Sequence, residues 1–287
     1  VNRFIRRCSE NYSEDCYILK LDISGFFMHI NKHILFKKLE AFIQEKYYAS
    51  DKDLIIRLCH IVIFNDPTQN CIVKGEHTEW NGLPKLKSLF YSSENCGLPI
   101  GNLTSQILAN FYLDLFDHFV KRDLGIRFYG RYVDDFILIH RDKEYLKNMI
   151  PKVALFLREQ LGLTLHTKKI YLQHYTKGVK FLGVVIKLNR IYIANRTKGN
   201  FYQTIQKWNK RLKLNRELLR EEEKDFLSSM NAYLGIMKHY KTYKLRKQLL
   251  STVEAQFFEK FVVDRNCLKV QKKTTKRKKK KSRNVQM

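Results

Sequence analysis

The sequence lacks three features that would assign it to familiar protein classes. It has no run of about 18 apolar residues and no charged-then-apolar leader, so we expect a cytoplasmic protein with no membrane association. Its six cysteines form no Cys-x-x-Cys pair, which argues against a structural zinc site or a disulfide scaffold and favours reduced thiols. Acidic residues are scarce, because 28 Asp and Glu stand against 54 Lys and Arg.

This imbalance of charge indicates a polyanionic partner. The formal net charge is +26, and segment 271–287 supplies nine Lys and Arg without an acid, so the remainder still carries 26 − 9 = +17. A strongly basic protein binds nucleic acid well because its cations neutralise the phosphates and release their counterions. Nucleic acid is therefore a better partner than a membrane surface. With 44% hydrophobic and 13% aromatic residues, the chain can also bury a sizeable core in one large or two modest domains.

Hydrophobic periodicity predicts an α+β fold. Strands are expected at 16–21, 126–133, 136–140, 163–172, 179–188 and 191–194, and helices at 31–46, 51–64, 102–120 and 142–160. Asn31 and Asp51 are the predicted N-caps of the first two helices. Segment 65–96 carries turn residues without sustained periodicity and is predicted to be an irregular insertion. Segment 197–258 contains no proline and predicts three helices, and the basic tail after it is expected to be disordered.

Three aspartates fall where predicted strands end. Asp22 closes the first strand, and Asp134 and Asp135 lie in the turn between 126–133 and 136–140. If these strands are neighbours in one sheet, the carboxylates can bind two Mg²⁺ ions, which prefer oxygen ligands and serve nucleotidyl transfer. A strand cap at Asp22 and an ordinary Asp-Asp turn are the simpler alternatives.

Sequence motifs around these aspartates resemble those of reverse transcriptases. Tyr-Val-Asp-Asp at 132–135 is similar to their Tyr-x-Asp-Asp hairpin, and Asp-Ile-Ser-Gly-Phe-Phe at 22–27 is similar to their first metal motif. The resemblance runs from about residue 17 to residue 258. It implies that Asp22, the carbonyl of Ile23, Asp134 and Asp135 bind two Mg²⁺ ions. It also implies that template RNA, a primer with its cDNA, and dNTPs are the partners.

The resemblance further implies a right-hand polymerase. We expect an α+β palm with partial fingers over residues 1–195, including the insertion at 65–96. An α-helical thumb is expected over 196–265, and a disordered basic tail over 266–287. Family members carry further fingers residues ahead of their first metal motif, so we expect an N-terminally truncated chain that binds nucleic acid but polymerises poorly.

Several other residues match positions that contact substrates in this family. Phe27 occupies the place of an aromatic steric gate that collides with a ribose 2′-hydroxyl; a core aromatic is the alternative. The motif from Gly97 to Gln106 resembles the segment that shapes the nucleotide pocket, which implies roles for Ile100, Gly101 and Gln106. Lys169 is expected to protonate the leaving pyrophosphate as a general acid, with Lys168 as the alternative. Leu182 and Gly183 resemble the primer grip.

One departure from the common pattern suggests a subtype. Group II intron and retron enzymes carry Gln at the position of Ile100, and they end the motif with Ser-Pro, where this chain has Ser105-Gln106. The pattern is similar to reverse transcriptases of diversity-generating retroelements. That resemblance implies misincorporation opposite template adenines and a small, basic, ring-forming accessory protein. A retron or group II intron-type enzyme and a non-catalytic RNA-binding fragment are the alternatives.

Overall fold

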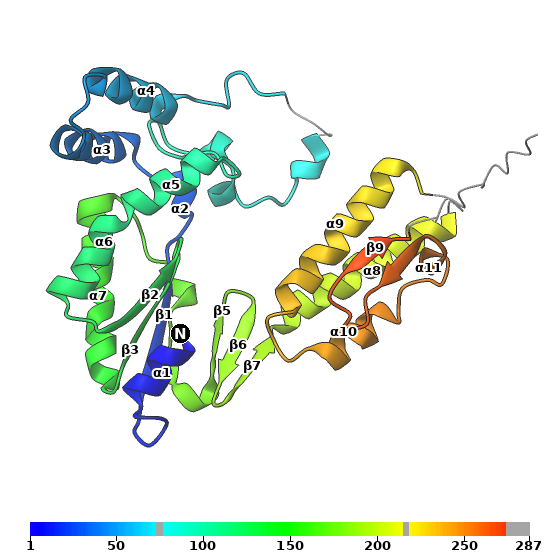
Figure 1. Cartoon of the computed structure of the whole chain (residues 1–287). Helices are drawn as coiled ribbons and strands as arrows, with labels where there is room; N and C mark the ends of the chain where they lie inside the picture. Colours follow the sequence, from blue (N-terminus) through cyan, green and yellow to red (C-terminus); the bar gives the residue numbers. More distant parts are fainter. Residues whose placement is uncertain (73–76, 215–217, 274–287) are drawn as a thin grey trace, which may run out of the picture. The chain divides into compact units, whose positions relative to one another are not determined.

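The structure of the chain is a computed structural model that describes residues 1–72, 77–214 and 218–273. The chain divides into two compact units, Val1–Lys177 and Gly178–Met287 (Figure 1). This division lies earlier in the chain than the predicted boundary between residues 195 and 196. Three short strands therefore belong to the second unit, and the assignment of palm, fingers and thumb to residue ranges stays a prediction.

The first unit is built on a four-stranded antiparallel sheet with the strand order β2-β3-β1-β4. Its strands are β1 (Tyr17–Asp22), β2 (Phe128–Tyr132), β3 (Asp135–His140) and β4 (Tyr171–His174). Its helices are α1 (Asn2–Cys8), α2 (Phe26–His29), α3 (Lys32–Lys46), α4 (Lys52–Phe64), α5 (Leu103–Tyr112), α6 (Asp114–His118) and α7 (Lys143–Leu161). The predicted α+β class is confirmed.

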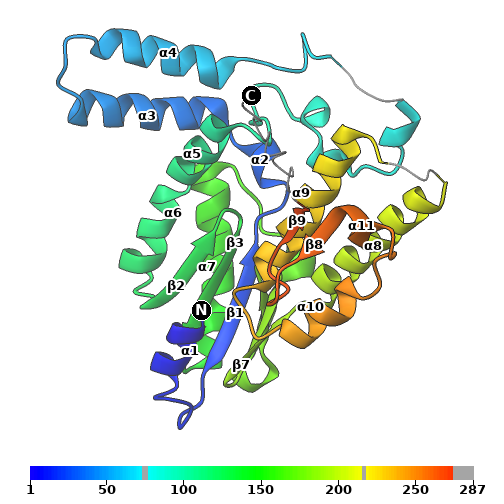
Figure 2. The same cartoon turned by 45° about the vertical axis from the view of Figure 1, so that its right-hand side comes forward.

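The two central strands, β1 and β3, hold the core of this unit. Four consecutive residues of β3, from Phe136 to Ile139, are buried. Helix α7 packs along β1, β3 and β4, as Figures 1 and 2 show. The ring of Phe116 in α6 meets Phe136 edge to face at 5.0 Å, a contact that contributes about 0.5–1.5 kcal/mol beyond area burial. Buried packing therefore fixes the strands whose ends carry the aspartates.

Helices α3 and α4 form an antiparallel pair at one end of this unit (Figure 2). The predicted N-cap of α3 is confirmed, because the Asn31 side chain accepts a hydrogen bond from the amide of Ile34 at 3.0 Å. The N-cap position of α4 is Asp51, but its side chain caps no amide. Its carboxylate instead accepts a hydrogen bond from the Tyr47 hydroxyl at 2.9 Å.

One sequence prediction in this unit is confirmed in part, and another is wrong. The helix expected at 102–120 is interrupted at Leu113, where ψ is 0°, and it ends in a π-turn at Phe119–Asp123. Leu113 keeps right-handed backbone angles, so apolar periodicity does not reveal the interruption. The strand expected at 163–172 is mostly irregular: Leu165 forms an isolated bridge with Ile23, and Thr167–Lys169 is a 3-10 turn ahead of β4.

The insertion at 65–96 is irregular, as predicted. Its described residues contain three 3-10 turns, His77–Trp80, Lys85–Lys87 and Leu89–Tyr91, and no strand. An isolated bridge between Asn31 and Cys96 joins its end to the start of α3.

The second unit contains a β5-β6-β7 sheet, a β8-β9 hairpin and four helices within its described residues. The strands are β5 (Val179–Phe181), β6 (Val184–Lys187), β7 (Arg190–Ile193), β8 (Phe261–Val263) and β9 (Val270–Lys272). The helices are α8 (Asn195–Leu214), α9 (Arg220–Met237), α10 (Tyr243–Leu250) and α11 (Phe257–Lys260). Three helices were expected at 197–258, and the short α11 is the additional one.

Residues 266–273, expected to begin a disordered tail, are ordered in the structure. The side chain of Asn231 explains this order, because it donates to the Val270 carbonyl at 2.9 Å and accepts from the Val270 amide at 2.8 Å. The rest of the predicted tail, 274–287, lies outside the described residues. No helix in the described part of the chain is long and apolar enough to span a bilayer. All six cysteines are free thiols, as predicted.

Candidate active site

The pairing of β1 with β3 brings the predicted aspartates together. Asp22, the last residue of β1, lies directly opposite Asp135, the first residue of β3. Asp134 immediately precedes β3, in the turn that connects it to β2. The amide of Ile23 donates to the Asp134 carbonyl at 3.4 Å, which ties the turn to the end of β1. The predicted adjacency of the two strands is therefore confirmed, whereas the chemical roles of these residues stay predictions.

Two lysines face the carboxylates. The ammonium group of Lys169 lies 2.6 Å from Oδ2 of Asp22, and that of Lys20 lies 3.0 Å from Oδ1 of Asp135. Lys20 and Asp22 point to the same face of β1 because side chains alternate along a strand, so Lys20 reaches Asp135 diagonally. Lys168 is exposed and forms no ion pair with these carboxylates in the described residues. Of the two predicted general acids, Lys169 is therefore the one at the site.

The 3-10 turn is what places Lys169 there. Two backbone hydrogen bonds flank the bridge between Ile23 and Leu165: Ser24 donates to the Thr164 carbonyl, and His166 donates to the Asp22 carbonyl, both at 2.8 Å. The chain then turns through Thr167–Lys169 before it enters β4. An uninterrupted strand, as expected from the sequence, would alternate its side chains instead of directing Lys169 back at Asp22.

The electrostatics of the site disfavour a further negative charge. Burial raises the pKa of the Asp134 carboxyl above its ordinary value, and the charges of Asp22 and Asp135 raise that pKa further, while Lys169 lowers it. Asp22 is only 9% exposed, so its charge is poorly screened. Crowded carboxylates of this kind are stabilised by a cation.

Three carboxylates and the Ile23 carbonyl are oxygen donors, the ligand type that Mg²⁺ prefers. By chemistry, this donor set fits the divalent metal expected from the sequence. Within the described residues, however, no group of three or more His, Cys, Asp or Glu side chains is arranged to hold a metal ion. The ammonium groups of Lys20 and Lys169 supply the positive charge next to Asp135 and Asp22 instead.

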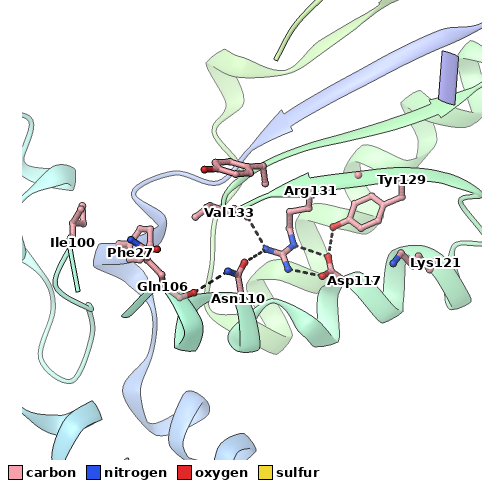
Figure 3. Close-up of a pocket in the computed structure, with 12 residues that line it drawn as sticks. Phe27, Ile100, Gln106, Asn110, Asp117, Lys121, Tyr129, Arg131 and Val133 are labelled. Atoms are coloured by element: carbon pink, nitrogen blue, oxygen red, sulfur yellow. Dashed lines mark hydrogen bonds and ion pairs between the residues drawn. The ribbon is translucent and has the colours of Figure 1, made fainter. Parts of the chain in front are cut away.

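Four of the predicted substrate residues line one cavity of about 570 Å³ (Figure 3). They are Phe27, Ile100, Gly101 and Gln106. Ile100 is 68% exposed, so its alkyl side chain does not fill the protein core. Val133 lines the same cavity, which therefore reaches the turn that carries Asp134 and Asp135. The residues that line the cavity are both polar and apolar.

The wall of this cavity also contains a hydrogen-bond network that the sequence did not reveal. Arg131 of β2 donates to both carboxylate oxygens of Asp117 in α6, and the Tyr129 hydroxyl donates to the same carboxylate at 2.6 Å (Figure 3). Burial and the charge of Asp117 raise the pKa of Tyr129. The position of Arg131 next to the Tyr-Val-Asp-Asp motif was the one available signal, because nothing in the sequence links it to Asp117.

The predicted primer-grip residues, Leu182 and Gly183, form the turn between β5 and β6. Both have positive φ, 49° and 77°. Leu182 is 47% exposed, so its side chain and the adjacent backbone are accessible to a ligand. These residues belong to the second compact unit, and their relation to the carboxylates stays a prediction.

A family model matches this chain over residues 3–186, and its description is reverse transcriptase (RNA-dependent DNA polymerase). The match covers the four-stranded sheet, the three aspartates and the cavity. The chain therefore belongs to the reverse transcriptase family, whose members are nucleotidyltransferases that generally use divalent metal ions. No curated protein sequence gives a significant match.

Telomerase structures from Candida species are similar to this chain. Apo telomerase of Candida tropicalis, truncated from its C-terminal domain, has 17% identity and a TM-score of 0.48 over 67% of this chain and 39% of the telomerase chain. Candida tropicalis telomerase in complex with a TWJ fragment of telomeric RNA has 14% identity and a TM-score of 0.48, over 86% and 44% of the two chains. Candida albicans telomerase in complex with a TWJ fragment of telomeric RNA has 12% identity and a TM-score of 0.43, over 89% of this chain and 44% of the telomerase chain. This chain thus spans less than half the length of these structures.

Proposed function

We propose that this chain synthesises cDNA on an RNA template by two-metal nucleotidyl transfer. The observation that carries the proposal is the register of β1 and β3, which sets Asp22 opposite Asp135 with Asp134 beside them. Membership of the reverse transcriptase family supports the same reaction. The surplus of Lys and Arg supports an RNA template and a primer as partners, because both are polyanions.

The proposed roles follow from where each residue lies. Asp22, Asp134, Asp135 and the carbonyl of Ile23 would hold two Mg²⁺ ions. Bound Mg²⁺ supplies positive charge that favours ionisation of the primer hydroxyl and stabilises the departing pyrophosphate. Lys169 would donate a proton to the pyrophosphate oxygen. The ring of Phe27 would exclude a ribose 2′-hydroxyl from the pocket, and the turn at Leu182 and Gly183 would hold the primer terminus.

The subtype proposal rests on Ile100. Its alkyl side chain, exposed in the cavity where related enzymes carry an amide, removes hydrogen bonds that would hold the incoming nucleotide and template in register. We infer an error-prone reverse transcriptase of a diversity-generating retroelement that misincorporates opposite template adenines. A cytoplasmic location and a small, basic, ring-forming accessory protein belong to the same proposal.

Primer extension on an RNA template tests the reaction. Wild-type chain, Asp134→Ala and the control Asp123→Ala, which removes an exposed carboxylate from the same unit, are compared with and without Mg²⁺. We expect Mg²⁺-dependent extension by the wild type and the control, and its loss in Asp134→Ala. RNA binding without extension would contradict the proposal and favour a non-catalytic RNA-binding fragment.

A further inference from the structure

Arg131 makes an unusually complete set of hydrogen bonds for a side chain beside an active site. Its Nε and one terminal nitrogen donate to Asp117 at 2.8 and 2.6 Å. The other terminal nitrogen donates to Oδ1 of Asn110 and to the main-chain carbonyl of Val133, both at 3.1 Å. The side chain is only 10% exposed, so solvent does not compete for these bonds. Figure 3 shows Arg131 between α6 and the aspartate turn.

The carbonyl that Arg131 binds belongs to a strained residue. Val133 has a φ of 56°, in the left-handed region that a β-branched residue rarely adopts. Such a conformation persists only where the surroundings over-determine it. The same carbonyl is part of the peptide bond between Val133 and Asp134. Holding it therefore fixes the plane of that peptide, and with it the direction in which the Asp134 side chain leaves the backbone.

The other end of the network is anchored in the helices of the nucleotide pocket. Asp117 of α6 is held by the Tyr129 hydroxyl as well as by Arg131. Asn110 of α5 donates to the Gln106 carbonyl at 3.1 Å while it accepts from Arg131. A continuous chain of hydrogen bonds thus runs from Gln106, in the pocket, to the turn that carries Asp134. The guanidinium group suits this role because its planar fork can bind a carboxylate and a carbonyl at once.

We propose that Arg131 is a positioning residue that holds the Val133 to Asp134 peptide in its strained, productive orientation, with Asp117 as its anchor. Arg131 acts through Asp134 and contacts no reacting atom. This inference rests on the proposed polymerase function and adds to it a residue that sets the backbone conformation of the turn carrying Asp134. A lysine at position 131 keeps the charge, but its single nitrogen cannot bind Asp117 in bidentate fashion and also reach the Val133 carbonyl.

Single-nucleotide incorporation kinetics test the proposal. Wild-type chain is compared with Arg131→Lys, Asp117→Asn, their double variant and Arg127→Lys, which changes an exposed arginine just ahead of the same strand. Rates are normalised to the folded fraction measured by thermal unfolding. We expect kcat of Arg131→Lys and Asp117→Asn to fall about tenfold or more, because small displacements of a catalytic group are costly. The KM for dNTP should stay within about twofold of wild type, since Phe27, Ile100 and Gln106, the cavity residues proposed to contact the nucleotide, are unchanged.

The two single losses should not add in the double variant, because both break one chain of bonds. A purely structural role would lower the unfolding temperature and leave the normalised kcat of Arg131→Lys equal to that of Arg127→Lys. That result would overturn the proposal.

Terbium(III) luminescence provides a readout without catalysis. Tb³⁺ binds clustered carboxylates, and the signal that Asp134→Ala abolishes reports the site. We expect the affinity for Tb³⁺ to be about fivefold or more weaker in Arg131→Lys than in Arg127→Lys, because the Asp134 carboxylate is no longer held. Equal affinity, or a wild type that binds no Tb³⁺ at this site, would overturn the role of Arg131. If the wild type fails to polymerise but Arg131→Lys weakens Tb³⁺ binding, the proposed function fails and the positioning role stands.

Discussion

The ammonium group of Lys169 lies 2.6 Å from the carboxylate of Asp22, although 147 positions separate the two residues in the sequence. The Lys169 side chain is 55% exposed and that of Asp22 only 12%. The lysine therefore reaches from solvent to a buried carboxylate. In the proposed reaction, an incoming triphosphate has more negative charge than one aspartate, so we expect it to draw the ammonium group toward the leaving pyrophosphate.

Replacing Lys169 should slow nucleotide incorporation. We expect Lys169→Met to lower kcat by about a hundredfold, the typical contribution of a general acid, because Lys169 is the proton donor paired with Asp22, whereas Lys20 is paired with Asp135. Lys168→Met is the matched control, since it removes the neighbouring exposed charge, and it should change kcat by less than about threefold. Pre-steady-state incorporation with a saturating dNTP measures both. Equal losses in the two variants would assign the effect to general charge rather than to proton transfer.

The adjacency of the aspartates was predictable from sequence, whereas the contacts that support them were not. Strand-type residues ahead of Asp22 and on both sides of Asp134 and Asp135 predicted the strands, and the resemblance to reverse transcriptases implied that these strands are neighbours. The register of β1 and β3 agrees. Whether Lys168 or Lys169 faces the aspartates depends on the 3-10 turn at Thr167–Lys169. Hydrophobic periodicity does not predict so short a turn, so the sequence left the choice between the two lysines open.

Long-range polar contacts explain most of the remaining differences. Arg131 meets both Asn110 and Asp117, which are seven residues apart and so share one face of α5 and α6, but nothing in the sequence pairs that face with β2. The strand β9 was expected to be disordered because its segment is basic. Two hydrogen bonds between Asn231 and Val270, one donated by each residue, order it, and nothing in the sequence pairs these residues.

Shortening Phe27 should weaken discrimination against ribonucleotides. The Phe27 side chain lines the cavity together with Ile100 and Gln106, and its ring lies edge-on to that of Phe26. We expect Phe27→Val to raise the relative kcat/KM for a ribonucleotide over the matching dNTP by about tenfold or more, because the steric barrier to the 2′-hydroxyl is lost. Phe27→Tyr keeps the ring and should preserve discrimination. An unchanged ratio in Phe27→Val would show that Phe27 is a packing residue.

Glu223 should make the stability of the second unit depend on pH. Its carboxylate contacts Lys272 and Lys260, and a hydrogen bond from Lys272 is the main reason that the pKa of Glu223 lies below its ordinary value. A depressed folded-state pKa stabilises the fold above the unfolded pKa, near 4.5, and that contribution is lost as the pH falls through the folded pKa.

Glu223→Gln should therefore lower the unfolding temperature at pH 7, and this effect should shrink as the pH falls below 4.5 and through the folded-state pKa of Glu223. The matched control is Glu259→Gln, which changes an exposed carboxylate of α11. Thermal unfolding followed by circular dichroism between pH 3 and pH 7 measures both. A difference between wild type and Glu223→Gln that is constant over this range would show that the carboxylate acts by packing rather than by charge.

Ile100→Gln should raise fidelity at template adenines. An amide at this exposed position of the cavity can hydrogen-bond the nucleotide and template. Once the bound substrate buries such a contact, a mispair that leaves it unsatisfied costs about 1–3 kcal/mol. We expect the error frequency opposite adenine to fall about tenfold. Errors opposite the other three bases, which serve as the internal control, should change much less. Sequencing of cDNA made on one RNA template by both proteins measures the two frequencies. Equal frequencies at adenine would separate this chain from the error-prone subtype and favour a retron or group II intron-type enzyme that tolerates isoleucine in its pocket.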